Sequence, residues 1–411
     1  MISPPPRLLI VSPHNSYRTA RYIQAARQLC VDVLLLCGKS PWALPVDQPG
    51  LYFNPEHPEA VIQHLDDMDI IGVCATDDST VELAAQIAAR HSVRTNQLES
   101  VAFTRNKGLG RIRLKQTELN CPWFIVINGK AAQNDFLEDI TFPVVIKPTQ
   151  LSASRGVIRA NNYRELQDAI QRNIRLLDQE FKNTSYEMLI EEYIPGEEVA
   201  VEGLMYDGEL HTLAIFDKPE PLTGPYFEES YYVTPSRHSV SVIKEIIATT
   251  TRACFAYGIH NGPIHAEMRI NSNGIWLLEL ACRTIGGDCG LLIEFVTGSS
   301  VEELAILNSL GYKPTTSNNS GAAGVLMIPV PATGILRRVE GIGAARKISG
   351  IVSVEIDIKT GQLLQQWPEG GSYPGFIFSR GDNPTEVEKS LRLAHEELNF
   401  VVAPTLETTT N

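Results

Sequence analysis

Residues 262–287, GPIHAEMRINSNGIWLLELACRTIGG, are the stretch from which the rest of the chain is interpreted. Their alternation of polar and apolar residues around a Ser-Asn-Gly sequence predicts a β-hairpin. If residues 272–274 form a three-residue loop with glycine in the left-handed conformation, Glu267 lies directly opposite Glu279. Directly opposed side chains are about 4.5 to 5.5 Å apart at Cβ. The stretch therefore predicts two carboxylates at one point.

This hairpin is expected to have one apolar and one polar face, because side chains alternate along a strand. The predicted apolar face consists of Ala266, Met268, Ile270, Trp276, Leu278 and Leu280. The predicted polar face consists of His265, Glu267, Arg269 and Glu279. Two like charges in opposed positions destabilise a strand pair, so the two glutamates need a cation or a shared proton between them.

Two interpretations of the opposed glutamates stay open at this level. A Mg²⁺ ion is held by one or two carboxylates together with substrate phosphates, which fits a nucleotide-binding site. Alternatively, Arg269 and Arg283 neutralise Glu267 and Glu279 on a solvated face.

Composition restricts the class of protein. A chain of 411 residues predicts two or three domains. An apolar fraction of 43% with 20% charged residues is typical of a soluble globular protein. The net charge of -13 argues against nucleic-acid and anionic-membrane partners, and the longest apolar runs are far shorter than a membrane span.

The cysteines and the first residues indicate a compartment. The chain has seven cysteines, an odd number, and no two of them form a CxxC pair. This is typical of reduced thiols. The start MISPPPRLLIV lacks the basic region and the long apolar core of a signal peptide. We therefore expect a cytoplasmic enzyme.

The first hundred residues predict an α/β domain. A buried-type strand at Arg7–Ser12, a helix at Ala20–Leu29 and a second strand at Asp32–Leu36 form the start of a βαβ unit. No GxGxxG sequence joins the first strand to the helix, so a dinucleotide site is not supported here.

The most basic segment, TRNKGLGRIRLKQTEL, is predicted to be a helix that begins near Thr104. Its cations are Arg105, Lys107, Arg111, Arg113 and Lys115. Lys107 and Arg111 share a helix face at i,i+4, where like charges repel unless an anion covers them. The segment predicts a phosphate contact, and a solvated basic face is the alternative.

A second candidate phosphate contact follows the strand 142–147. The strand ends in Lys147, and the next residues, TQLSASRGV, are mostly small. Small residues let backbone N–H groups approach phosphate oxygens, and a lysine adds a point charge. An ordinary surface turn is the alternative. Asn162 then predicts the N-cap of a helix that runs to about Phe181.

A group of acids follows in EEYIPGEE. Glu191, Glu192 and Glu198 either bind a ligand or protect a strand edge from aggregation. Asp207-Gly208 predicts a tight hairpin turn, and Lys218 ends the second strand of that hairpin. The next segment, PEPLTGPYFEES, is expected to be a lid or a long surface loop.

The order of these motifs, two lysines, a small-residue loop, EEYIPGEE, two opposed acids and RxGG, resembles the ATP-grasp superfamily over essentially the whole chain. Within it, the chain looks most similar to L-amino acid ligases and related carboxylate-amine ligases. The resemblance implies an α/β ATP-grasp fold. Its expected parts are an N-terminal α/β (pre-ATP-grasp) domain at 1–100, an ATP-grasp core at 101–314 with a lid subdomain at about 121–193, and a C-terminal α+β closing domain at 320–405.

The resemblance also implies the site residues. The ATP-binding residues that match the pattern are Lys107, Lys147, Ser152, Ala153, Ser154, Gly156, Glu191, Glu192, Ile194 and Glu198. The metal-binding matches are Glu267 and Glu279, and the catalytic matches are Arg283, Lys218 and His265. Gly286 and Gly287 match the glycine pair after the arginine. One position departs from the pattern, because Ala281 stands where the family usually has asparagine, and we expect a second Mg²⁺ to bind weakly.

The activity implied is ATP-dependent carboxylate-amine ligation through an acyl phosphate, with release of ADP and phosphate. ATP and Mg²⁺, with Mn²⁺ as a possible substitute, are the expected cofactors. The expected substrates are a small carboxylate and an amine, both amino acids, and a homodimer is a possible assembly. Two alternatives are a carboxyphosphate-forming carboxylase of the biotin carboxylase type and a nucleotide-binding module without turnover.

Overall fold

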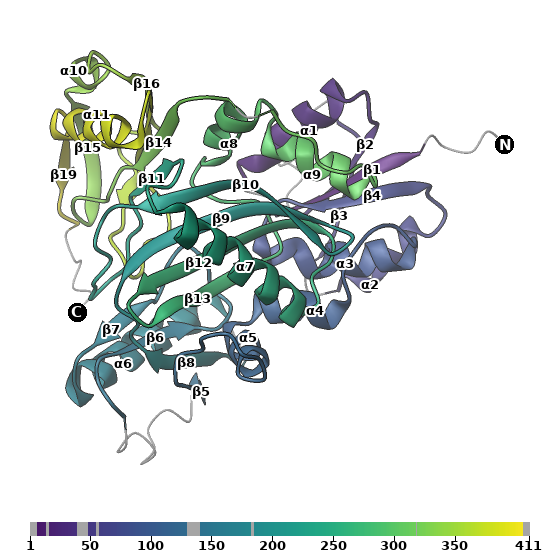
Figure 1. Ribbon diagram of the computed structural model, residues 1–411, viewed down its shortest axis with the longest axis horizontal. Helices are drawn as coiled ribbons and strands as arrows, with labels where there is room; N and C mark the ends of the chain where they lie inside the picture. The colour runs from purple at the N-terminus through teal and green to yellow at the C-terminus, as the bar shows by residue number, and fades with distance from the viewer. Residues whose placement is uncertain are drawn as a thin grey trace, which may run out of the picture.

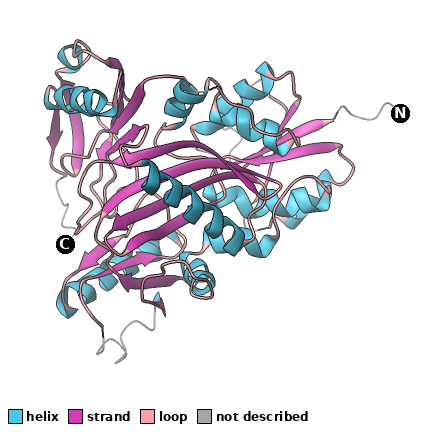
Figure 2. Cartoon of the chain, viewed as in Figure 1, coloured by secondary structure: helices cyan, strands magenta, loops and turns pink. Residues whose placement is uncertain are grey.

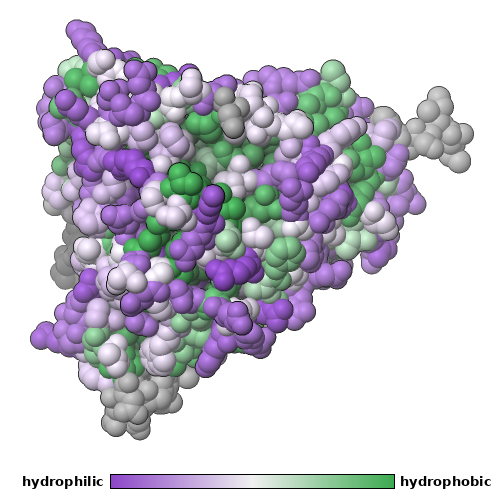
Figure 3. Space-filling model, in the orientation of Figure 1, coloured by the Kyte–Doolittle hydropathy of each residue, from purple (hydrophilic) through white to green (hydrophobic). Residues whose placement is uncertain are grey.

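The computed structural model describes residues 6–13, 16–38, 48–54, 57–129, 140–181, 185–317 and 319–405. These residues form helices and strands in alternation along much of the chain (Figure 2). None of the helices in these ranges has the length and the apolar character needed to cross a membrane. The face seen in Figure 3 is mostly hydrophilic, with smaller hydrophobic areas between the polar ones.

The N-terminal part contains a four-stranded parallel sheet in the order β3-β2-β1-β4 (Figure 1). Its elements are β1 (Arg7–Ser12), α1 (Arg18–Gln28), β2 (Val33–Cys37), β3 (Gly50–Tyr52), α2 (Glu59–Leu65), β4 (Ile70–Ala75), the 3-10 turn η2 (Asp78–Thr80) and α3 (Val81–Arg90). β1 and β2 are buried along almost their whole length, as expected for parallel strands covered on both faces. The predicted βαβ unit is confirmed, because β1 and β2 pair in parallel with α1 between them along the chain.

A helix from much later in the chain completes this N-terminal core. α9 (Val301–Ser309) packs against α1 and β4. Its residues Ala305 and Ile306 are buried in the same cluster as Leu8 and Ile10 of β1. The N-terminal sheet is therefore fixed to the rest of the molecule by a shared hydrophobic core.

The next part is an antiparallel sheet covered by one long helix. Its elements are α4 (Leu98–Arg105), α5 (Lys107–Leu114), β5 (Phe124–Asn128), β6 (Val144–Pro148), β7 (Ile158–Ala160), α6 (Tyr163–Glu180) and β8 (Glu187–Glu192). The four strands lie in the order β5-β8-β6-β7, and we call this sheet with α6 the lid subdomain. Asn162 caps α6 as predicted, because its Oδ1 accepts the N–H of Glu165 at 3.0 Å.

The basic segment is not one helix from Thr104. α4 ends at Arg105, and α5 begins at Lys107. Between them Asn106 is extended, and its Oδ1 accepts the N–H groups of Gly108 at 2.9 Å and Leu109 at 3.2 Å. Asparagine is among the best N-cap residues, so it ends one helix and starts the next.

The centre of the molecule is an eight-stranded sheet in the order β13-β12-β9-β10-β11-β14-β18-β16. Its elements up to the last helix before the C-terminal part are β9 (Glu197–Tyr206), β10 (Glu209–Lys218), β11 (Tyr231–Thr234), α7 (Val240–Tyr257), β12 (Gly262–Asn271), β13 (Gly274–Ala281) and α8 (Gly290–Thr297). α7 crosses one face of this sheet (Figures 1 and 2). Asp207 and Gly208, with φ of 48° and 84°, form the predicted turn between β9 and β10.

The hairpin of β12 and β13 has the predicted pairing of Glu267 with Glu279 but a different geometry. Asn271 pairs with Gly274, so the turn has two residues, and a β-bulge at Leu278 restores the register. The bulge reverses the alternation on the first half of β13. The apolar face predicted there was wrong for two residues: Ile275 and Leu277, instead of Trp276 and Leu278, enter the hydrophobic core.

The C-terminal part shares the central sheet. Its elements are β14 (Ala322–Met327), β15 (Gly334–Glu340), α10 (Ile342–Ala345), β16 (Ile351–Ile356), β17 (Leu363–Leu364), β18 (Gly375–Gly381), α11 (Pro384–Glu396) and β19 (Asn399–Ala403). β14 pairs with β11, while β17, β15 and β19 form a small separate sheet. The predicted domain boundaries stay predictions. Strands of the C-terminal part continue the central sheet, so these two parts of the molecule share one sheet.

Candidate active site

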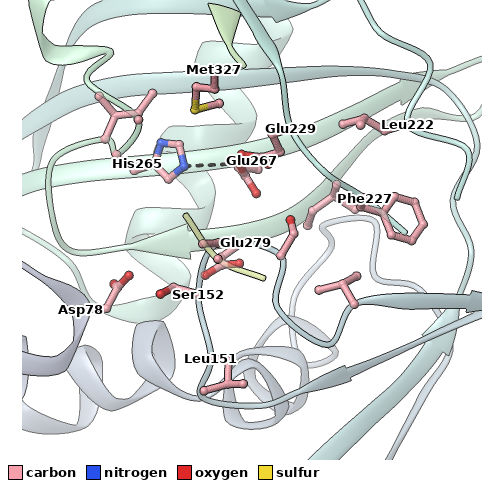
Figure 4. A pocket seen from close by; sticks show the side chains of 18 of the residues that line it. Asp78, Leu151, Ser152, Leu222, Phe227, Glu229, His265, Glu267, Glu279 and Met327 are labelled. Atoms are coloured by element: carbon pink, nitrogen blue, oxygen red, sulfur yellow. Dashed lines mark ion pairs between the residues drawn. The ribbon is translucent and has the colours of Figure 1, made fainter. Parts of the chain in front are cut away.

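A cavity of about 540 Å³ lies where the N-terminal part, the lid subdomain, the central sheet and the C-terminal part meet (Figure 4). The predicted site residues that line it are Lys107, Lys147, Ser152, Ala153, Ser154, Glu191, Glu192, Ile194, Glu198, His265, Glu267, Glu279 and Arg283. Two predicted site residues, Gly156 and Lys218, do not line it. The structure thus brings nearly all of the sequence-predicted residues to one cavity.

Lys147 enters the cavity from the end of β6 as one of two cations bound to Glu191. Its Nζ is 2.5 Å from Glu191 Oε1, and Arg111 Nε is 2.7 Å from Oε2 of the same carboxylate. Burial alone would raise the pKa of Glu191, but the attraction of Arg111 and Lys147 outweighs it and lowers the pKa to about 2. Two cations with one carboxylate leave a net positive charge beside the cavity.

Arg111 does not share an exposed anion with Lys107, as the i,i+4 spacing suggested. It is almost fully buried, and besides Glu191 it donates to the carbonyl oxygen of Leu278 at 2.9 Å. The interpretation of Arg111 as a phosphate contact was therefore wrong. Its partner lies on β8, which the helix periodicity could not reveal.

Lys107, at the start of α5, lies between the small-residue loop and the hairpin. Its Nζ donates to the carbonyl oxygen of Leu151 at 2.8 Å and is 3.2 Å from Glu279 Oε1. Its ammonium group therefore connects the small-residue loop to the hairpin at the cavity, where Figure 4 shows Leu151 and Glu279.

The small-residue loop has a strained backbone that other parts of the chain hold in place. Ala153 and Ser154 have φ of 56° and 54°, which non-glycine residues seldom adopt. The carbonyl oxygen of Ala153 accepts a hydrogen bond from Trp367 Nε1 at 2.9 Å. Gly156, with φ of 72°, donates its N–H to the carbonyl oxygen of Pro368 at 2.9 Å. Gly156 thus anchors the loop behind the cavity.

Lys218 is buried below the cavity among three carboxylates. Its Nζ is 2.9 Å from Glu198, 2.7 Å from Glu229 and 2.6 Å from Glu267. One oxygen of each acid lies within 4.8 Å of the others. Burial would lower the pKa of Lys218, but the three acids outweigh it and raise this pKa well above its usual value. Lys218 therefore stays charged and holds the acids together.

Glu267 and Glu279 face each other across the hairpin, as predicted (Figure 4). Their cationic partners are Lys218 and Lys107, respectively. Neither arginine of the alternative interpretation pairs with them, because Arg269 binds Glu198 at 2.9 Å and Arg283 binds another acid. Two opposed carboxylates within reach of lysine ammonium groups form a donor set of hard oxygens that fits Mg²⁺.

His265 lies between two carboxylates on the floor of the cavity. Its Nδ1 contacts Glu202 and its Nε2 is 3.4 Å from Glu267 Oε1 (Figure 4). Burial would lower the pKa of His265, but Glu202 outweighs it and raises the pKa to about 9. His265 also pairs across the hairpin with Ala281, the position that departs from the family pattern.

Arg283 connects the hairpin to the N-terminal part. Its Nε is 2.8 Å from Oδ2 of Asp78, which belongs to η2 after β4. Close by, Arg18 of α1 donates its Nη1 to the carbonyl oxygen of Thr76 at 2.8 Å. The N-terminal part therefore supplies one wall of the cavity.

Comparisons with known proteins agree with this arrangement. Residues 140–291 match the ATP-grasp domain family, and residues 326–403 match the family of L-amino acid ligase C-terminal domain 2. The chain contains an ATP-grasp domain and a C-terminal domain of the L-amino acid ligase type.

Two relatives and one solved structure illustrate the similarity. Dapdiamide A synthase of Enterobacter agglomerans is 27% identical over 81% of this chain and 80% of its own length. Alanine–anticapsin ligase of Bacillus subtilis (strain 168) is 29% identical over 41% of this chain and 39% of its own. The crystal structure of L-amino acid ligase from Bacillus licheniformis covers 97% of this chain and 99% of its own, with a TM-score of 0.82 and 24% identity.

Several residues of this ATP-grasp ligase site were missed by the sequence analysis. They are Arg18, Asp78, Glu202 and Glu229. Glu229 is the last but one residue of the segment that was expected to be a lid or surface loop, and the two acids in FEES were the signal that could have revealed it. The other three lie in stretches with no motif, and only their partners in space reveal them.

Proposed function

We propose that this ATP-grasp ligase transfers the γ-phosphoryl group of ATP to a substrate carboxylate and that an amine then attacks the acyl phosphate. The products are an amide or peptide, ADP and phosphate. The observation that carries the proposal is the cavity itself, in which Lys107, Lys147 and the opposed pair of Glu267 and Glu279 lie beside Arg283. This is the arrangement of charges that phosphoryl transfer to a carboxylate requires.

The protein contributes to the first step mainly through fixed charge. Lys107 and Lys147 bind the ATP phosphates, and the amides of Ser152–Ser154 lie over them. Glu267 and Glu279 would hold Mg²⁺ together with phosphate oxygens, and the ion would supply positive charge to the transferred group. Because these groups are preorganised by buried ion pairs, little reorganisation is needed during the reaction.

Arg283 acts on the substrate side. Its guanidinium group is held by Asp78 through Nε, and Nη1 donates to the carbonyl oxygen of Thr284 at 3.2 Å. Nη2 then binds the carboxylate and later the acyl phosphate. Lys218 does not touch the cavity and is a positioning residue for Glu198, Glu229 and Glu267. His265 does the same for Glu267, since it contacts that carboxylate from the buried side.

The substrates are two amino acids or an amino acid and a related acid. The names of the relatives support this, because one is a ligase that joins alanine to anticapsin and the solved structure is an L-amino acid ligase. We place the enzyme in the cytoplasm, where reduced thiols persist, and all seven cysteines are free in the part of the chain that the structure describes.

The test is ATP turnover with a panel of amino-acid pairs and Mg²⁺, followed by product analysis. ADP and phosphate are expected in equal amounts with the amide, and hydroxylamine should trap the acyl phosphate as a hydroxamate. Formation of AMP and pyrophosphate would reject the acyl phosphate. Phosphate release that depends on bicarbonate would support the carboxylase alternative, and ATP binding without turnover would support the binding module.

A further inference from the structure

Arg18 is a buried cation at the cavity, and none of the carboxylates that the structure describes forms an ion pair with it. It is the first residue of α1, it is 7% exposed, and it lines the cavity. Nη1 donates to the carbonyl oxygen of Thr76 at 2.8 Å, and Nε donates to Tyr17 Oη at 3.3 Å. Both partners are uncharged, and Nη2 has no hydrogen-bond partner among the residues that the structure describes.

The other buried cations of the site are different. Lys147, Lys218, Arg269 and Arg283 each contact at least one carboxylate. A buried charge costs several kcal/mol unless an opposite charge compensates it. Among the arginine and lysine residues just named and Arg18, only Arg18 has no direct contact with a carboxylate of the described residues.

The acids nearest to Arg18 do not serve it. Asp288 pairs with Arg21 at 3.1 Å. Glu302 is buried, which raises its pKa. Attraction to Arg18 opposes this rise for Glu302, as it does for Asp288, but neither acid forms an ion pair with Arg18 among the residues that the structure describes. The guanidinium group of Arg18 is therefore available to an anion that enters the cavity.

The chain leaves space for such an anion. A Cβ atom at Gly286 would lie 3.1 Å from Arg18 Nη2 and 3.9 Å from Tyr17 Oη. Glycine at this position therefore keeps one side of the guanidinium group open. Tyr17, Arg18 and Gly286 all line the cavity and form what we call the Arg18 corner.

The Arg18 corner lies next to the reacting centre. Arg18 binds Thr76, and Arg283 binds Asp78, two residues further along the same turn after β4. The two arginines thus hold one short segment. The phosphate-binding lysines come from α5 and β6 instead. An anion at Arg18 is therefore beside the acyl group and not in the nucleotide site.

We propose that Arg18 binds a carboxylate of the amine substrate, so that the enzyme selects amines that carry a carboxylate close to the amino group. An α-amino acid has this geometry, because its carboxylate and its nitrogen are attached to the same carbon. The reacting carboxylate of the other substrate binds at Arg283. This inference rests on the proposed function and assigns Arg18 as the residue that determines specificity for the amine.

The test compares three acceptors in wild type and in Arg18→Gln: the amino acid that reacts fastest, its own carboxamide, and hydroxylamine. In the variant, kcat/KM for the amino acid should fall about 10- to 100-fold, the range expected for hydrogen bonds to a charged group. Hydroxamate formation and the rate with the carboxamide should be unchanged. Arg18→Lys keeps the charge but loses the planar fork, and its loss should be smaller.

Arg27→Gln is the matched control, because Arg27 is exposed on the same helix. Protection against thermal unfolding by each common L-amino acid, with its amide for comparison, provides a readout that needs no turnover. With the acid substrate present at saturation, additional protection by an amino acid, but not by its amide, should be present in wild type and absent in Arg18→Gln.

Two results would overturn the inference. One is a loss of hydroxamate formation in Arg18→Gln equal to the loss with the amino acid, which would assign Arg18 to the acid substrate. The other is equal use of, and equal protection by, an amino acid and its carboxamide in wild type. Failure of the proposed function is distinct from both, since wild type would then form no hydroxamate with any acid.

Discussion

At the scale of single residues, the site is a set of cations whose partners decide what each can do. Glu191 holds both Arg111 and Lys147, yet only Lys147 lines the cavity. One carboxylate can compensate only one of these charges. Lys147 is therefore the cation with unused charge for a phosphate, and Arg111 is its structural counterpart.

Replacing Lys147 with alanine should weaken ATP binding by about 10- to 100-fold, because a hydrogen bond to a charged group is lost. The fold should persist, since Arg111 still compensates Glu191. Calorimetric titration with ATP and Mg²⁺ measures the change. Lys244→Ala, an exposed lysine on α7, is the control. If Lys147→Ala and wild type bound ATP with equal affinity, Lys147 would not be a phosphate-binding residue.

Asp78 should make stability depend on pH through its pairing with Arg283. Burial would raise the pKa of Asp78, but the attraction of Arg283 outweighs it and lowers the pKa to about 2. A lowered pKa stabilises the folded state above the ordinary carboxyl pKa, and this contribution is lost as pH falls toward 2. It amounts to about 2 kcal/mol near neutral pH, and about half of it is lost by pH 3.

The measurement is urea unfolding of wild type and Asp78→Asn between pH 6 and pH 3. We expect the variant to be less stable at pH 6, with a smaller difference at pH 3. A difference that is the same at both pH values would mean that Asp78 stabilises the fold by packing and not by its charge.

At the scale of elements, the small-residue loop depends on its glycine. A Cβ atom at Gly156 would lie 2.2 Å from Asn173 Oδ1 and 2.8 Å from the ring of Pro148, and φ is already 72°. Asn173 in turn donates to the carbonyl oxygen of Gly156 at 2.9 Å. The end of the loop is therefore fixed to α6 and β6 by close backbone contact.

Gly156→Ala should destabilise the protein by about 1 to 3 kcal/mol, through the left-handed backbone and the steric overlap. It should also raise KM for ATP, because the loop over the phosphates must shift. Thermal unfolding and steady-state kinetics test the two effects. Gly343→Ala is a suitable control, since nothing lies within 4 Å of a Cβ atom there and φ is ordinary. If the stability fell while KM for ATP stayed unchanged, Gly156 would be important for folding and not for ATP binding.

At the scale of the whole molecule, the C-terminal part is bonded directly to the lid subdomain beside the cavity. Trp367 and Pro368 bind the backbone of Ala153 and Gly156, and Glu369 pairs with Arg172 of α6. The same C-terminal segment continues to Tyr373, which lines the cavity and packs on Trp367 with ring centroids 4.9 Å apart. This segment of the C-terminal part therefore contacts both the small-residue loop and the cavity.

Trp367→Phe removes the N–H donor to Ala153 and keeps an aromatic ring. KM for ATP should rise about 2- to 10-fold, the range for one hydrogen bond. Trypsin should cleave faster after Arg155, which lies in the loop. Trp123→Phe, an exposed tryptophan, is the control. Equal cleavage rates in Trp367→Phe and wild type would show that Trp367 does not hold the loop.

The sequence alone determined the local features of this protein. The pairing of Glu267 with Glu279, the cap at Asn162 and the turn at Asp207-Gly208 depend on a few neighbouring residues, whose backbone preferences and side-chain alternation are readable. The order of the motifs also indicated the family. Even the bulge at Leu278, which the sequence did not reveal, left the Glu267–Glu279 pairing unchanged.

Only the tertiary structure decided which acidic side chain pairs with which basic one. Arg111 was expected to bind a phosphate and instead compensates the charge of Glu191. Arg283 forms an ion pair with Asp78, which lies in the N-terminal part of the chain. The physical reason is that an ion pair is selected by the burial of both partners, and burial follows from how separate elements pack. The same packing left Arg18 buried at the cavity without a carboxylate, which no local pattern in the sequence records.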